Sequence, residues 1–150
     1  MAYEISTTTE IAATPENVWA VLADLASYPE WHPMYQAVSG HLAAGSTLTI
    51  TSTHPTSGRT ITAKVKVLTA EPDTELRWVS KLLGRTISER TFQLSSTVDG
   101  TSLVQAGTYS GLGGGRGRAM TKVIGRIQDT FVAINQAIKE QAEARQQASG

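Results

Sequence analysis

The stretch from Arg116 to about Ala144 constrains the fold more than any other part of the chain. Its apolar residues recur every three or four positions, at Met120, Val123, Ile124, Ile127, Phe131, Ile134 and Ile138. This spacing is typical of the apolar stripe of an amphipathic α-helix. We predict a helix over residues 117–144, which would be roughly 40 Å long given the helical rise per residue. The rest of the chain must supply the surface that buries this stripe.

The chain has 150 residues, zero formal net charge and no cysteine. This length suits one domain with a buried core, so we expect a single domain over residues 1–150, with residues 145–150 frayed. The zero net charge gives no electrostatic basis for binding nucleic acid. The lack of cysteine excludes disulfides and thiolate metal sites, and no two histidines have the spacing of metal ligands. We therefore expect no metal and no other cofactor.

The first residues show neither the basic nor the apolar region of a signal peptide. No apolar run approaches the length that spans a bilayer. We therefore expect a cytoplasmic protein without a membrane span, present as a monomer or a homodimer.

The N-terminal part predicts a strand followed by short helices. Residues 3–12 are rich in threonine and isoleucine, which favours a first strand. Thr14, Pro15 and Glu16 are the residue types that begin a helix, because they offer a capping hydroxyl, a preset first turn and a negative charge near the positive end of the helix dipole. The two prolines of the segment 28–33 then allow at most one further turn.

From Tyr35 to Gly111 apolar and polar residues alternate, which is the period of β-strands. Turn residues separate the runs, at Pro55-Thr56-Ser57-Gly58, Pro72-Asp73, Gly84 and Asp99-Gly100. Asp99-Gly100 is the strongest hairpin signal and predicts a type I′ turn, in which both central residues have positive φ. Successive strands joined by short turns predict an antiparallel meander with one face toward the core.

These elements predict an α+β fold in which a curved antiparallel sheet of about six to seven strands wraps around the long C-terminal helix. Two short helices after the first strand close one end. Many side chains expected to point inward are small, such as Ala63, Ser80 and Gly107. They favour a cavity between the sheet and the helix, although small residues equally let a helix dock closer.

The order of elements and several motifs resemble the START-related (SRPBCC) superfamily of helix-grip folds, which includes polyketide cyclases, plant allergens and lipid-transfer domains. The similar stretches are Thr14-Pro15-Glu16-Asn17-Val18-Trp19, Tyr28-Pro29-Glu30-Trp31-His32-Pro33, Glu75-Leu76-Arg77-Trp78, Phe92-Gln93-Leu94 and Thr108-Tyr109-Ser110-Gly111. The resemblance covers nearly the whole chain and is strongest to small bacterial single-domain proteins of the cyclase/dehydrase-like type. It implies a deep, largely apolar pocket between the sheet and the long helix.

Two positions depart from the pattern that the resemblance implies. Similar sequences often have a histidine at the position of Arg90 and an acidic residue at that of Gly107. This chain has a cation at the first position and no side chain at the second. Any function that such a polar pair carries in relatives is therefore in doubt here.

Three residues are candidates for catalysis: Arg90, His32 and Tyr109. Alternation places Arg90 on the face of Phe92 and Leu94, where a guanidinium needs a partner and would hold a ligand oxyanion. The alternatives are a bulge that turns it to solvent, or a position at the sheet end beside Glu89. We expect His32 near the pocket mouth, as an acid or base or as a surface loop residue.

The predicted ligand-binding residues combine apolar walls with a few polar groups. They are Trp31, Trp78, Arg90, Phe92, Gln105, Tyr109, Ile127 and Phe131. For the aromatic residues, plain core packing is the alternative. The glycine run from Gly111 to Gly117 matches no phosphate-loop motif, and we interpret it as a gate over the cavity or a simple connection.

Three functions fit this sequence. The first is binding of a small, largely apolar molecule, such as a lipid, polyketide or aromatic metabolite, in the predicted cavity. The second is a polyketide cyclase or dehydratase that uses the same cavity, with Arg90, Tyr109 or His32 moving protons. The third is a co-chaperone-like module that binds a protein partner through the outer face of the sheet. Fold alone does not choose among them.

Overall fold

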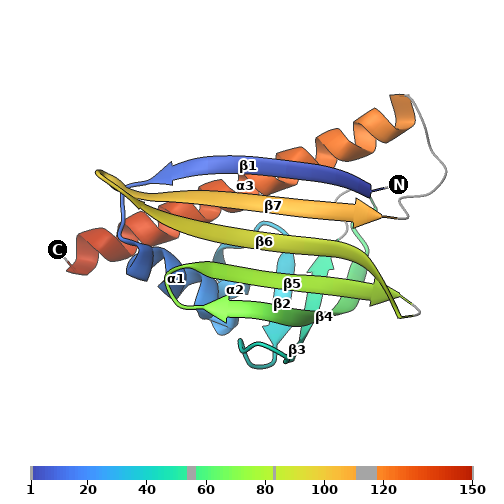
Figure 1. Ribbon diagram of the computed structural model, residues 1–150, viewed down its shortest axis with the longest axis horizontal. Coiled ribbons are helices and arrows are strands. Elements are labelled where there is room, and N and C mark those ends of the chain that lie inside the picture. Colours follow the sequence, from blue (N-terminus) through green and yellow to red (C-terminus); the bar gives the residue numbers. More distant parts are fainter. Residues whose placement is uncertain (1, 54–56, 83, 111–117, 150) are drawn as a thin grey trace.

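The computed structural model describes residues 2–53, 57–82, 84–110 and 118–149 (Figure 1). In these residues one antiparallel sheet has the strand order β1-β7-β6-β5-β4-β3-β2. The elements in chain order are β1 (Ala2–Ile11), α1 (Pro15–Ala23), the 3₁₀ helix η1 (Leu25–Ser27), α2 (Tyr28–Trp31), β2 (Tyr35–Ser39), β3 (Thr47–Thr53), β4 (Thr60–Glu71), β5 (Glu75–Leu82), β6 (Arg85–Thr97), β7 (Gly100–Ser110) and α3 (Arg118–Ser149). The predicted α+β helix-grip fold is confirmed, with a curved sheet, a long C-terminal helix and short helices after β1.

The start of α1 follows the predicted capping chemistry. The Thr14 hydroxyl accepts a hydrogen bond from the Asn17 backbone N–H at 3.3 Å, and Pro15 occupies the first turn. Val18 and Leu22 are buried on the inner face of this helix. The short α2 fits between the prolines of the segment 28–33, as expected.

The hairpin between β6 and β7 forms at the predicted place but not with the predicted turn. Val98 and Asp99 are the loop residues, because Thr97 already pairs with Gly100. Gly100 has a positive φ of 151°, whereas Asp99 is not among the residues with positive φ. A Cβ at Gly100 would lie 2.1 Å from the Ile11 carbonyl oxygen. Glycine is therefore required by close packing against the end of β1, and the expected type I′ geometry was wrong.

The helix α3 runs along β1, with its C-terminal end beside α1 (Figure 1). Among its described side chains, the buried ones lie from residue 131 onward: Phe131, Ile134, Asn135, Ile138 and Ala142. Val123, which belongs to the same apolar stripe, is 36% exposed. The stripe is thus buried against the sheet and α1 over part of its length.

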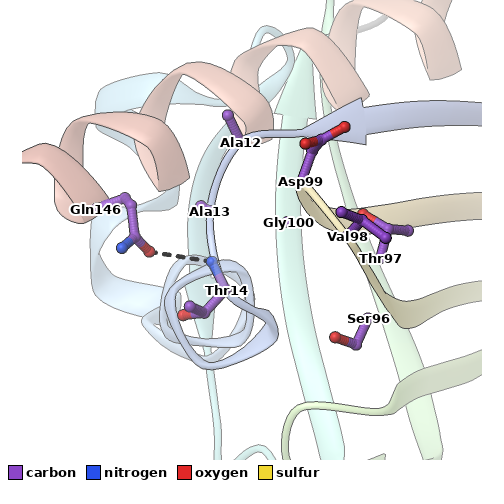
Figure 2. Close-up of a pocket in the computed structure, with 9 residues that line it drawn as sticks. All are labelled: Ala12, Ala13, Thr14, Ser96, Thr97, Val98, Asp99, Gly100 and Gln146. Atoms are coloured by element: carbon purple, nitrogen blue, oxygen red, sulfur yellow. Dashed lines mark hydrogen bonds between the residues drawn. The ribbon is translucent and has the colours of Figure 1, made fainter.

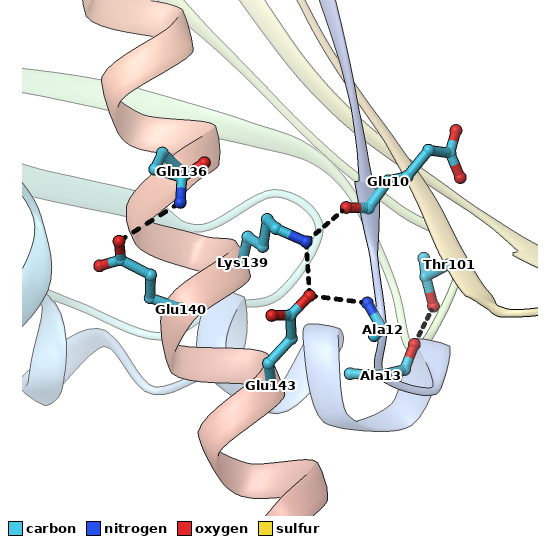
Figure 3. A network of polar contacts seen from close by, with 8 residues as sticks. All are labelled: Glu10, Ala12, Ala13, Thr101, Gln136, Lys139, Glu140 and Glu143. Carbon is cyan, nitrogen blue, oxygen red and sulfur yellow. Dashed lines mark hydrogen bonds and ion pairs between the residues drawn. The ribbon is translucent and has the colours of Figure 1, made fainter.

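Polar side chains of α3 cover the free edge of β1. Gln128 Nε2 donates to the Ser6 carbonyl at 3.4 Å, and Lys139 Nζ donates to the Glu10 carbonyl at 3.0 Å. Lys139 also bonds to Glu143 Oε2 at 2.6 Å, and the same oxygen accepts a bond from the Ala12 backbone N–H at 2.8 Å (Figure 3). Unpaired strand edges recruit other strands, so this network protects β1 while it docks the helix.

The helix continues past its expected end near Ala144 instead of fraying there. Gln146 Oε1 accepts hydrogen bonds from the Thr14 backbone N–H at 3.0 Å and from Asn17 Nδ2 at 2.7 Å. These bonds tie the last turns of α3 to the start of α1. In the described part of the chain, no helix combines the length and the apolar character that crossing a membrane requires.

Candidate functional site

Arg90 faces the interior of the curved sheet. It lies on β6 opposite Trp78 of β5 and opposite Gly107 of β7. Its Nη1 donates to the Tyr35 hydroxyl at 3.1 Å, and its Nη2 donates to the Tyr109 hydroxyl at 3.0 Å. Two other positions for Arg90 were considered from the sequence, one turned to solvent by a bulge and one at the sheet end beside Glu89. Neither occurs, because the guanidinium bonds to two tyrosine hydroxyls and Glu89 pairs with Arg77.

The positive charge of Arg90 has neutral partners. Among the described residues no salt bridge joins it to a carboxylate, whereas Glu89 pairs with Arg77 at 3.2 Å. Burial opposes the charged form of Arg90, but Tyr35 and Tyr109 more than offset this effect, so the pKa of Arg90 is raised. The guanidinium therefore stays protonated at neutral pH and carries a charge that no carboxylate of the described residues neutralises.

A cavity of about 130 Å³ lies in front of this charge. Its walls combine apolar side chains, three serines and the three polar groups just described. The lining residues are Tyr35, Ile50, Ser52, Ala63, Val65, Trp78, Ser80, Ser88, Arg90 and Tyr109. Of the predicted ligand-binding residues, the cavity brings together Trp78, Arg90 and Tyr109.

None of the described lining residues belongs to the long helix, although we expected the cavity to lie between the sheet and this helix. The reason is Phe131, which is fully buried and fills the space over β7. Its ring lies so close to Gly107 that a Cβ there would be 2.7 Å from Phe131 Cζ. The Arg90 guanidinium carbon lies 4.8 Å from the centre of the Phe131 ring. Phe131 thus contacts Arg90 but is not among the described residues that line the cavity.

The structure places four other predicted ligand-binding residues away from this cavity lining. Trp31 packs on Tyr28 with ring centres 4.8 Å apart, and its Nε1 donates to the Ser27 hydroxyl at 3.2 Å. Phe92 belongs to the core and packs edge-on against Trp78. Gln105 is buried beside α3, and Ile127 is partly buried on α3.

Gln105 fastens the helix to the sheet. Its Nε2 donates to the Phe131 carbonyl at 3.2 Å and to Asn135 Oδ1 at 2.6 Å. Asn135 Nδ2 in turn donates to the Thr9 hydroxyl of β1 at 3.1 Å. The amide that we expected near a ligand therefore joins β7, α3 and β1 in a buried polar network.

His32 is buried, with 8% of its surface exposed, and does not line the cavity. Its Nδ1 accepts hydrogen bonds from the backbone N–H groups of Met34 and Tyr35, both at 3.1 Å. Burial, together with the positive charge of Arg90, lowers the pKa of His32 to about 3. The imidazole stacks on the Tyr35 ring at 3.7 Å between centres. His32 thus contacts Tyr35 through its ring and through the backbone N–H, and it lies neither at the described cavity lining nor on the surface as a loop residue.

Seven lining residues were not predicted as site residues: Tyr35, Ile50, Ser52, Ala63, Val65, Ser80 and Ser88. For Ile50, Ser52 and Ser88 the signal was present, because Ser52 is two residues from Ile50 and Ser88 is two residues from Arg90 on the same strand face. Tyr35 had no such signal. Burial raises its pKa although the nearby Arg90 opposes this, so Tyr35 keeps its proton at neutral pH.

A larger hollow of about 330 Å³ lies at the other end of the sheet (Figure 2). It is formed by the β6–β7 hairpin, the segment from Ala12 to Thr14, and Gln146. Asp99 is the one charged residue among those that line it, and Val98 at the hairpin tip is fully exposed. This surface has no group of convergent side chains comparable to that around Arg90. The segment from Gly111 to Gly117, interpreted as a gate or a simple connection, lies outside the described residues.

The sequence and the fold both match known proteins. Residues 2–140 match the family described as polyketide cyclase / dehydrase and lipid transport. A comparison with curated proteins gives no match. A solved structure of similar fold is a protein from Nitrosomonas europaea, with a TM-score of 0.77, 16% identity and 95% coverage of both chains.

Two further solved structures carry descriptive names. A START superfamily protein from Mycobacterium smegmatis has a TM-score of 0.71 and 17% identity, covering 94% of this chain and 97% of its own. The di-domain ARO/CYC StfQ from the steffimycin biosynthetic pathway has a TM-score of 0.79 and 14% identity, covering 97% of this chain and 52% of its own. This chain thus spans about half of StfQ, and at such identities the likeness concerns the fold alone. Because the family model matches nearly the whole sequence, the chain belongs to the polyketide cyclase/dehydrase and lipid transport family.

Proposed function

We propose that the chain binds a small, largely apolar molecule that carries an oxygen-bearing polar group, in the cavity in front of Arg90. The observation that carries this proposal is the protonated guanidinium, which faces a cavity and is bonded to neutral tyrosine hydroxyls. An unneutralised charge in a partly buried site is costly unless something pairs with it. A ligand oxyanion or carbonyl oxygen would meet that need.

The surrounding side chains suit the rest of such a ligand. Ile50, Val65 and Trp78 offer apolar walls, and burying apolar surface contributes about 25 cal/mol per Å². The hydroxyls of Tyr35 and Tyr109 accept bonds from Arg90, so their own protons are available to a ligand oxygen. Charge-assisted bonds from the guanidinium are the stronger ones and would orient the ligand.

A cyclase or dehydratase activity in the same cavity is the second candidate. The convergence of Arg90, Tyr35 and Tyr109 favours it, because two O–H donors and a fixed cation can stabilise an enolate oxygen. The tyrosines would act as proton donors, whereas His32 would only position Tyr35. The third candidate, a module that binds protein partners, gains no support, since Lys64, Lys66 and Lys81 line the hollow on the outer face of the sheet.

Binding is tested by native mass spectrometry of protein purified from its own host, followed by thermal shift with a metabolite panel. We expect a co-purified small molecule, and a shift with compact aromatic or polyketide-like acids. An empty protein that no compound stabilises would contradict the proposal. Turnover of a co-purified carbonyl compound that is lost in Tyr35→Phe and Tyr109→Phe would favour the enzyme instead.

The role of the charge is tested with Arg90→Met, which keeps the apolar length and removes the guanidinium. We expect this variant to weaken binding of an anionic ligand at least tenfold more than binding of its neutral amide. The matched control is Arg77→Met, since Arg77 lies on β5 and pairs with Glu89. Equal losses for both ligands in Arg90→Met would show that the charge does not recognise the ligand.

A further inference from the structure

Gly107 has no side chain because Phe131 occupies the space where one would lie. A Cβ at this position would be 2.7 Å from Phe131 Cζ and 3.0 Å from Tyr109 Cε2. Gly107 is not among the glycines with positive φ, so its backbone conformation does not require glycine. Close approach of the ring is therefore the reason for glycine here.

Phe131 in turn packs against two of the polar residues that line the cavity. The Arg90 guanidinium carbon lies 4.8 Å from the centre of its ring, which is a favourable cation–π geometry. The Tyr109 ring lies 6.4 Å from it, tilted by 50°. Since Arg90 and Tyr109 line the cavity and Phe131 does not, the ring sets how far these two residues can retreat.

The depth that remains is small. The cavity of about 130 Å³ is below the roughly 300–1,000 Å³ of pockets that enclose drug-sized ligands. It is close to the engineered apolar cavity of about 150 Å³ that accepts a benzene molecule in another protein. The enclosed part of a ligand therefore has the size of one ring.

Resting on the proposed function, we infer that Phe131, seated on Gly107, restricts the ligand to a compact molecule of single-ring size whose oxyanion or carbonyl oxygen faces Arg90. Phe131 is a specificity-determining and positioning residue in this scheme. A shorter side chain at 131 lets Arg90 and Tyr109 move back and deepens the cavity. A side chain at 107 pushes the ring toward Arg90 and closes it.

The inference is tested with two acids of equal charge, benzoate and 1-naphthoate, titrated calorimetrically into the full chain. A site without a size limit binds the larger acid more tightly, because naphthoate buries more apolar surface. We expect the reverse for the wild type, with benzoate bound at least tenfold more tightly. We expect Phe131→Leu to reduce this preference at least fivefold. The control Ile138→Val, also in the buried face of α3, should leave the preference unchanged.

Gly107→Ala provides an independent arm. It should weaken benzoate binding at least tenfold, and the double variant Gly107→Ala/Phe131→Leu, in which the shorter side chain leaves room for the Cβ, should recover most of the loss. Tighter binding of naphthoate than of benzoate by the wild type, or an unchanged preference in Phe131→Leu, would overturn the size limit and leave the binding proposal standing. If neither acid binds the wild type, or if Arg90→Met binds both acids as the wild type does, the proposed function fails together with the inference.

Discussion

His32 should make the fold sensitive to mild acid, and His32→Asn should remove that sensitivity. In the folded chain the pKa of His32 is lowered to about 3 by burial and by Arg90. In the unfolded chain an ordinary histidine has a pKa of about 6.5. At pH values between these two pKa values, unfolding of the chain is therefore accompanied by the uptake of one proton at His32. The stabilising contribution of neutral His32 is complete above about pH 6.5 and is lost as the pH falls toward 3.

The size of the effect follows from the two pKa values. Each unit of pH between them costs about 1.4 kcal/mol of unfolding free energy for one proton. Between pH 7 and pH 5 the loss is ~2 kcal/mol, and this holds for any folded-state pKa below about 4. Asparagine at position 32 does not titrate, and its Oδ1 can accept the two backbone N–H bonds that Nδ1 now accepts.

The measurement is urea unfolding of both proteins at pH 7 and pH 5. We expect the wild type to lose ~2 kcal/mol more than His32→Asn over this range. His41→Asn is the matched control, because His41 is exposed. This variant should lose as much unfolding free energy between pH 7 and pH 5 as the wild type does. An equal loss for the wild type and His32→Asn would refute the assignment of a neutral, backbone-bonded imidazole.

Three further changes test the docking of α3 and the hairpin. Glu143→Gln should cost up to about 1 kcal/mol, because a partly exposed ion pair and a bond to the β1–α1 segment are weakened, and the cost should shrink in high salt. Asn135→Ala should cost about 1–3 kcal/mol in chemical denaturation, since it removes the shorter of the two hydrogen bonds of the buried Gln105 Nε2, and adding Gln105→Leu should recover part of the loss. Gly100→Ala should lower the free energy of unfolding by about 2 kcal/mol or more, because its Cβ would collide with the Ile11 carbonyl; a smaller loss in thermal unfolding would contradict the close packing.

The sequence predicted the elements well because each one has a strong local period. Alternation along β6 placed Phe92 and Leu94 in the core, and both are buried. The stripe of α3 was equally regular, yet Phe131 is fully buried whereas Val123 is 36% exposed. Periodicity shows which face of a helix can be buried but does not show which neighbour covers each turn. That information depends on where the sheet edge lies, which is a property of the whole fold.

The site was only partly predictable for the same reason. Alternation correctly placed Arg90, Trp78 and Tyr109 on one face of the sheet, and they line a common cavity. It could not predict Tyr35, whose hydroxyl meets Arg90 across a separation of 55 residues from a strand at the far edge of the sheet. It also grouped Gln105 with the cavity, although this residue lies nearer the helix. Residues on the same face of a strand, such as Gln105 and Tyr109, can lie at different positions along it, one beside the helix and the other beside the cavity.

The two positions that depart from the pattern implied by the resemblance lie side by side, since Arg90 and Gly107 are direct partners across β6 and β7. An acidic side chain at 107 would neutralise the guanidinium, and its Cβ alone would collide with Phe131. Glycine instead leaves room for the Phe131 ring. The face of this ring contacts the Arg90 guanidinium without neutralising its charge. Glycine in place of an acidic residue at position 107 thus leaves the charge of Arg90 among neutral hydroxyls. In the inferred scheme, the Phe131 ring that packs on this glycine also limits the depth of the cavity. Under the proposed function, the charge and the size of the ligand are therefore coupled, because both depend on which residue lies opposite Arg90.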